Sequence, residues 1–140
     1  MVIDELPAWA NEMLRTARVG RLGLIDDAER PRVLPVTFAL AGGRIYSAID
    51  HKPKRTSAPA RLRYLRSRPV AALTVDHYED DWSKLAWVQV LGRVLLPHPS
   101  SFPEGMEALA AKYEPYRAEP PPGPLIVLVP ERTLHWRASL

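Results

Sequence analysis

The sequence predicts one mainly β domain of the α+β class, a small closed or partly closed antiparallel barrel of about six strands with an N-terminal helix and two short helices. Three observations predict it. The chain has 140 residues, 46% of them hydrophobic, which suffices for one core but not for two. Its 15 prolines, about twice the ordinary usage, disfavour long helices. Its apolar segments are short and separated by polar or glycine-containing turns. We therefore expect residues 1–140 to form a single domain.

The first half of the chain predicts a helix and three strands. Apolar residues recur at helical spacing from residue 6 to residue 17, with Asp4 as the expected N-cap and Pro7 in the first turn. Strands are expected at 20–25, 32–40 and 44–49. The turn 41–43, Ala-Gly-Gly, supplies the positive φ angles of a tight hairpin. These three consecutive strands should form an antiparallel meander.

The second half predicts two short helices and the remaining strands. Ser57 can cap the first helix, which buries Leu62 and Leu65 and ends before Pro69. The second helix is expected at 103–113. Further strands are expected at 70–75 and 85–96, and then at 125–129 and 133–136, either as a pair or as one interrupted strand. Gly92, within the longest strand, indicates a β-bulge or a barrel corner.

Positive charge is concentrated in one part of the sequence. The net charge is only +3, yet Arg15 to Arg68 contains 13 basic and four acidic residues. His51 to Arg68 contains seven Lys or Arg and no acid. This basic block fits a solvated loop and helix face, a site for a phosphate-bearing small molecule, or a nucleic-acid surface.

Two segments contain candidate ligand-binding residues. Residues 51–57, His-Lys-Pro-Lys-Arg-Thr-Ser, bring cations and hydroxyl groups to the start of a helix, a combination that suits a phosphate monoester. Residues 76–87 are acidic and aromatic. Their tryptophans, Trp82 and Trp87, either anchor a barrel edge or stack on a planar heterocycle.

Several classes of function are excluded or disfavoured. The chain has no cysteine, so disulfides, thiolate metal sites and cysteine nucleophiles are absent. Glycine-rich nucleotide motifs, His-Glu-x-x-His and Gly-x-Ser-x-Gly are missing. The four histidines are dispersed, and the acids at 76–81 read as an exposed turn, so we expect no metal site. With no long apolar run and no signal-like N-terminus, the expected location is cytoplasmic.

Several motifs together resemble one known family. They are Ala-Arg-Val-Gly-Arg-Leu-Gly at 17–23, Pro-Arg-Val-Leu-Pro-Val-Thr-Phe at 31–38, Asp-His-Lys-Pro-Lys at 50–54, Val-Asp-His-Tyr at 75–78, Asp-Asp-Trp at 80–82 and Leu-Gly-Arg-Val at 91–94. In this set and order they resemble the split β-barrel flavin and deazaflavin oxidoreductases related to pyridoxamine 5'-phosphate oxidase. The likeness is greatest to the actinobacterial branch that uses coenzyme F420.

The resemblance implies a six-stranded antiparallel split β-barrel that forms a homodimer, with cofactor clefts at the subunit interface. Lys52, Lys54 and Arg55 would hold the cofactor phosphate, with Arg61 as a further candidate. Pro35, Val36, Thr37 and Phe38 would lie along the tricyclic ring, offering mainly backbone groups. Trp82 and Trp87 would line the cleft, from the same subunit or from its partner. Where relatives often have asparagine before the proline at 69, this chain has Tyr64.

The implied reaction is hydride transfer between reduced F420 and an unsaturated or electron-poor organic substrate. The cofactor carries the hydride, so few catalytic side chains are needed. Tyr46, Tyr78 and His77 are the candidate proton donors.

The main alternative is an FMN-dependent oxidase, reductase or binding protein of the same fold. An alternative of another class is a nucleic-acid-binding barrel that uses the cations of 61–68.

Overall fold

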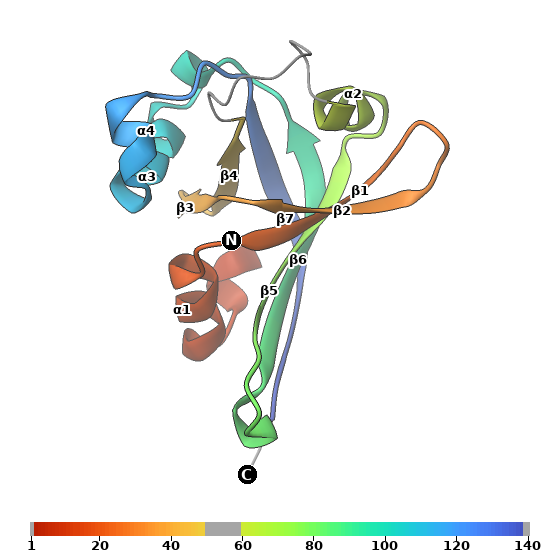
Figure 1. Ribbon diagram of the computed structural model, residues 1–140, viewed down its shortest axis with the longest axis vertical. Helices are drawn as coiled ribbons and strands as arrows, with labels where there is room; N and C mark the ends of the chain where they lie inside the picture. The colour runs from red at the N-terminus through yellow and green to blue at the C-terminus, as the bar shows by residue number, and fades with distance from the viewer. Residues whose placement is uncertain (1, 50–59, 139–140) are drawn as a thin grey trace.

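The computed structural model describes residues 2–49 and 60–138. Seven antiparallel strands form one sheet in the order β2-β1-β5-β6-β7-β4-β3 (Figure 1). The strands are β1 Gly20–Ile25, β2 Pro31–Val36, β3 Ala39–Ala41, β4 Arg44–Ala48, β5 Val70–His77, β6 Ala86–Leu95 and β7 Leu125–Arg137. The sheet is strongly curled, which confirms the predicted mainly β, split-barrel class of fold.

The curl follows from one short connection. β2 and β3 lie at opposite edges of the sheet, yet only Thr37 and Phe38 separate them in the chain. A link of this length spans about 10 Å at most, so the two edges approach one another and the sheet forms a half-barrel. We call residues 37–38 the crossover.

The crossover corrects two sequence predictions. The expected strand at 32–40 is two strands, so the sheet has seven strands rather than six. The expected meander is wrong, because β2 pairs with β1 while β3 pairs with β4. The physical reason is visible in the burial pattern: Phe38 and Ala39 are consecutive and both buried, which breaks the alternation of a continuous strand.

The helices surround this sheet. They are η1 Val2–Glu5, α1 Ala8–Thr16, α2 Ala60–Ser67, η2 Trp82–Lys84, η3 Pro99–Ser101, α3 Pro103–Lys112 and α4 Glu114–Ala118. Pro7 occupies the N-cap position of α1, so the expected Asp4 cap is wrong and Asp4 lies in η1. Ser57 lies outside the described residues, and α4 was not expected. No described helix has the length and apolarity needed to cross a membrane.

Two hydrophobic cores hold the fold together. The larger core packs α1 and α2 against the inner face of the sheet, and the smaller packs α3 and α4 against β3, β4 and β7. In β7, Ile126 and Leu128 enter the larger core, while Leu125 and Val127 enter the smaller. Both faces of this strand are therefore buried there, which explains its unbroken apolar run.

The predicted irregularity at Gly92 is confirmed. The register between β6 and β7 shifts between Leu91 and Gly92, and β7 continues through it as one strand. A Cβ atom on Gly92 would lie 2.0 Å from the carbonyl oxygen of Val129. Only glycine therefore permits this close approach of the two backbones.

Candidate functional site

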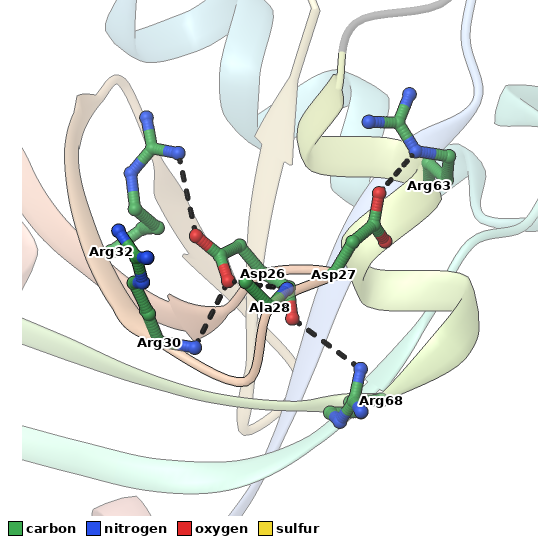
Figure 2. Close-up of polar contacts among 7 residues, drawn as sticks. All are labelled: Asp26, Asp27, Ala28, Arg30, Arg32, Arg63 and Arg68. Atoms are coloured by element: carbon green, nitrogen blue, oxygen red, sulfur yellow. Dashed lines mark hydrogen bonds and ion pairs between the residues drawn. The ribbon is translucent and has the colours of Figure 1, made fainter.

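The β1–β2 turn is held by the carboxylate of Asp26 (Figure 2). Its Oδ1 accepts hydrogen bonds from the backbone N–H groups of Ala28 and Arg30, both at 2.9 Å. The guanidinium of Arg32 lies 3.7 Å from its Oδ2. The hydrogen bond from Arg30 is the largest cause that lowers the pKa of Asp26 below its ordinary value.

Helix α2 docks on this turn through one of its own cations and through the cation that follows it (Figure 2). Arg63 Nε donates to Asp27 Oδ2 at 2.8 Å. Arg68, just after the helix, donates to the carbonyl oxygen of Asp26 at 3.4 Å and to Glu29 Oε1 at 3.3 Å. Two cations of the basic block therefore have acidic partners within the chain and serve to anchor the helix.

Arg61 differs from these neighbours. It lies in the first turn of α2 and is half-buried, and it makes no ion pair with any acid in the described part of the chain. Arg66 is also unpaired there but is exposed. The other expected phosphate ligands, Lys52, Lys54 and Arg55, lie outside the described residues and stay a prediction.

The crossover, where the cofactor ring is expected, is tied to the rest of the fold by hydroxyl groups. The Thr37 hydroxyl and the Tyr116 hydroxyl lie 2.7 Å apart, and Ser47 Oγ donates to the carbonyl oxygen of Thr37 at 2.7 Å. Next to it, Pro35 is exposed on the edge strand β2 and Val36 is buried. These contacts fix the backbone between the two sheet edges.

Phe38 is held more tightly still. Its N–H donates to Tyr113 Oη at 3.1 Å, and its carbonyl oxygen accepts from Lys112 Nζ at 2.8 Å and from the Tyr113 hydroxyl at 3.0 Å. The same hydroxyl lies 2.9 Å from the carbonyl oxygen of Arg18. The backbone groups of Phe38 are therefore engaged internally, and a ligand along residues 35–38 would use those of the neighbouring residues.

Burial perturbs two groups around Phe38. Desolvation, with a smaller repulsion from Arg18, lowers the pKa of Lys112 to about 8. Desolvation also raises the pKa of the Tyr113 hydroxyl. Tyr113 lies at the end of the helix expected at 103–113, but a lysine in a last helical turn carries no local signal that it is half-buried.

The two expected tryptophans lie far from α2. Trp82 is in η2, at the tip of the β5–β6 hairpin, and 68% of it is exposed. Strand β5, 8 residues and about 26 Å long, separates this tip from the C-terminal end of α2 (Figure 1). Trp87 lies near the same tip, opposite Trp136 in β7. One chain therefore does not bring these side chains and Arg61 into one site.

The candidate proton donors are also dispersed. Tyr46 is fully buried beneath α3 and donates to Glu104 at 3.3 Å, and burial raises its pKa. Tyr78 is exposed and accepts a bond from Trp82 Nε1 at 3.4 Å. His77 is exposed and bonds to Glu79. The described residues thus contain no shared acid–base site built from these three groups.

The acidic turn has structural roles. Asp81 Oδ1 accepts from the N–H of Ser83 at 3.1 Å and so caps η2. Asp76 pairs with Arg21 at 3.6 Å, and Glu79 lies 3.9 Å from Lys84 Nζ. Within 2–49 and 60–138, no group of three or more His, Asp or Glu side chains is placed to hold a metal ion.

A cavity of about 330 Å³ is lined by none of the expected site residues. It is bounded by η1, α1 and the β3–β4 hairpin, and its lining residues are Ile3, Asp4, Asn11, Arg15, Leu40, Ala41, Gly42 and Gly43.

The outer face of the sheet exposes large apolar side chains from several strands. These are Val33 of β2, Val70 of β5, Trp87 and Leu95 of β6, and Trp136 of β7, which are 36% to 67% exposed. Residue alternation and register place them on the same side of the sheet. We call this set the outer apolar face. Such a face on a folded chain is typical of an interaction surface.

Comparison with known families identifies the class of protein. The sequence model of the pyridoxamine 5'-phosphate oxidase family matches residues 8–124, and the chain belongs to this family. No curated protein matches the chain. The family membership expected from the motifs is therefore confirmed.

Solved structures share the fold at low sequence identity. An FAD-binding protein from Mesorhizobium loti superposes with a TM-score of 0.71 and 20% identity, covering 96% of each chain. An F420 reductase gives 0.65 and 20%, covering 92% of this chain and 98% of its own. A heme-binding protein from Mycobacterium smegmatis gives 0.74 and 18%, covering 95% and 55%. The fold thus occurs in proteins named for different cofactors.

Proposed function

We propose that this protein binds the deazaflavin coenzyme F420 and transfers a hydride to an unsaturated or electron-poor organic substrate. Family membership and the fold shared with an F420 reductase support an oxidoreductase. When bound, the deazaflavin supplies the hydride-transfer chemistry. The protein's part is then to bind and orient the cofactor, which agrees with the scattered positions of Tyr46, Tyr78 and His77.

The observation that carries the proposal is the contrast between Arg61 and Arg63. Arg63 forms an ion pair with Asp27. Arg61, in contrast, is half-buried in the first turn of α2 and has no acidic partner among residues 2–49 and 60–138. A guanidinium together with first-turn amide groups suits a phosphate. This donor set fits the cofactor phosphate, with Lys52, Lys54 and Arg55 proposed to complete it.

The crossover would orient the ring. Its position is fixed from two sides, by Ser47 of β4 and by Tyr113 and Tyr116 at the end of α3 and in α4. A rigid backbone segment orients a planar ligand at little entropic cost. In this arrangement Pro35 and the backbone of Val36 contact the edge of the ring, and Thr37 and the buried Phe38 hold that backbone in place.

The cleft would need two copies of the chain. Trp82 and Trp87 lie at the far end of β5 from Arg61, so they can line the same cleft only if they come from a partner subunit. The outer apolar face offers a surface for such a homodimer, and Trp87 belongs to that face. We therefore place the cofactor at the boundary between the two subunits.

Cofactor titration tests the proposal. Purified protein is titrated with F420, FMN and FAD, following ligand fluorescence. Arg61→Gln should weaken F420 binding about tenfold or more, because a charge-assisted hydrogen bond is lost. Arg63→Gln is the matched control, because it makes the same change two residues along α2. It should leave the affinity for F420 unchanged and lower the free energy of unfolding slightly. Equal effects of both variants, or no F420 binding by the native protein, would reject the proposal.

The alternative is an FMN-dependent or FAD-dependent protein of the same fold, which the FAD-binding neighbour supports. Micromolar or tighter flavin binding with no binding of F420 would favour it. The nucleic-acid alternative loses support, because Arg63 and Arg68 are occupied by acids of the β1–β2 turn. It would return only if mixed oligonucleotides bound with an affinity that fell steeply with salt.

A further inference from the structure

Two cations meet at one tyrosine ring beside the crossover. The guanidinium carbon of Arg18 lies 4.9 Å from the centroid of the Tyr113 ring, and Lys112 Nζ lies 5.4 Å from the same centroid. The two charges are therefore at most about 10 Å apart, and repulsion from Arg18 contributes to lowering the pKa of Lys112. They come from different parts of the chain, since Arg18 precedes β1 and Lys112 ends α3.

The ammonium of Lys112 has only neutral partners among the described residues. It donates to the carbonyl oxygen of Phe38 and lies 4.0 Å from the centroid of the Phe38 ring. Neither Lys112 nor Arg18 forms an ion pair with an acid in residues 2–49 and 60–138, and Glu114, the acid nearest to Lys112 in sequence, is exposed. The other titratable groups at this point are the hydroxyls of Tyr113 and Tyr116, which bond to the crossover and its neighbours.

Burying an ammonium group without an anionic partner raises the free energy of the folded protein. A second cation nearby raises it further by repulsion. An anion that binds to both cations would offset both of these unfavourable contributions. The site is also reachable, because Arg18 is exposed and Lys112 is only half-buried. Groups whose pKa is perturbed by burial together with a specific charged neighbour cluster at functional sites.

We propose that Arg18 and Lys112 form a binding site for the acidic group, carboxylate or phosphate, of a small-molecule ligand. Arg18 grips the oxygens with its planar guanidinium, and Lys112 adds a point charge from the crossover side. The ring of Tyr113 contacts both cations. It uses different residues, on different elements, from the phosphate site proposed at Arg61 of α2.

The site also bears on the substrate. Lys112 holds Phe38, which in the proposed function keeps the backbone at the cofactor ring in place, so an acid bound here lies beside that ring. The proposed function would then act on substrates that carry a carboxylate or phosphate. This extension rests on the proposed function, whereas the anion site itself does not.

The test is calorimetric titration of the native protein, without added cofactor, with inorganic phosphate and separately with succinate. Arg18→Gln and Lys112→Met should each weaken binding about tenfold. Arg15→Gln removes the same charge from α1 and should have little effect. Arg18→Gln leaves the hydrogen bond from Lys112 to Phe38 intact, so its result stands even if Lys112→Met is unstable. Preference for phosphate or for succinate distinguishes the two acidic groups.

Proton linkage provides a second measurement. A bound anion raises the pKa of Lys112, so binding above about pH 8 should take up a proton and binding near pH 6 should not. Lys112→Met should abolish this uptake. If phosphate binding is lost in Arg61→Gln and kept in Arg18→Gln, the anion site is wrong while the cofactor proposal stands. Absence of binding by both probes, or an equal loss in Arg15→Gln, also overturns it.

Discussion

Tyr113 and Phe38 are joined by reciprocal hydrogen-bonding contacts: the N–H of Phe38 donates to the Tyr113 hydroxyl at 3.1 Å, and that hydroxyl lies 3.0 Å from the Phe38 carbonyl oxygen. Residue Tyr113 follows the last turn of α3, while Phe38 lies in the crossover between the two sheet edges. One side chain thus connects the smaller core to the point where the half-barrel closes. The position of the crossover therefore depends on the packing of α3.

Tyr113→Phe should lower the free energy of unfolding by about 1–3 kcal/mol, because it leaves a buried backbone N–H without its partner. Urea denaturation measures the change. Tyr78→Phe is the matched control, since the same hydroxyl is removed from a side chain that is 65% exposed. A loss of equal size in both variants would show that the Tyr113 hydroxyl does not anchor the crossover.

Gly92→Ala should destabilise the fold by about 1–3 kcal/mol or more, because the new methyl group would meet the Val129 carbonyl oxygen at 2.0 Å. Gly23→Ala is the matched control in a neighbouring part of the sheet. There the added Cβ has its nearest neighbour, the Ala72 carbonyl oxygen, at 3.7 Å, an ordinary contact. Thermal unfolding of the two variants should therefore differ clearly, and equal melting temperatures would contradict the bulge geometry.

Local signals in the sequence predicted most of the secondary structure. The hairpin glycines Gly42 and Gly43 have the expected positive φ angles of 56° and 76°. Leu62 and Leu65 are buried on α2, as their spacing predicted. The order of strands was not predictable in this way, because β2 and β3 separate to opposite edges through contacts of Thr37 and Phe38 with Tyr113 and Tyr116, more than 70 residues away.

In the candidate site, too, the contacts between distant parts of the chain could not be predicted from local sequence signals. The basic block and the acids of residues 26–29 are both visible in the sequence, but their pairing depends on how α2 packs against β1 and the β1–β2 turn. The ion pair of Arg63 with Asp27 could therefore not be predicted from the basic block alone, where Arg63 is one of the cations of 61–68. The half-buried position of Lys112 likewise depends on the crossover, which no nearby sequence pattern indicates.

Asp26→Asn should destabilise the protein near neutral pH and much less in acid. Hydrogen bonds from Arg30 and Ala28 hold the folded-state pKa of Asp26 below its ordinary 3.8. Its stabilisation is therefore complete above about pH 4 and is lost as the pH falls through the folded-state value. Urea titrations at about pH 7 and pH 3 measure the difference between native and variant protein. Asp80→Asn, at the exposed hairpin tip, should change stability little at either pH.

Trp136→Glu should prevent the homodimer proposed here. Trp136 is 46% exposed and lies opposite Trp87 in the register of β6 and β7, so a charge there would have to be buried in the interface. Light scattering during gel filtration should give a dimer mass for the native protein and a monomer mass for the variant. Trp87→Glu should act in the same way, because it changes the other member of the pair. Ala111→Glu adds the same charge to the exposed side of α3 and should leave the dimer intact. A monomeric native protein at all concentrations would exclude a cofactor cleft built from two subunits.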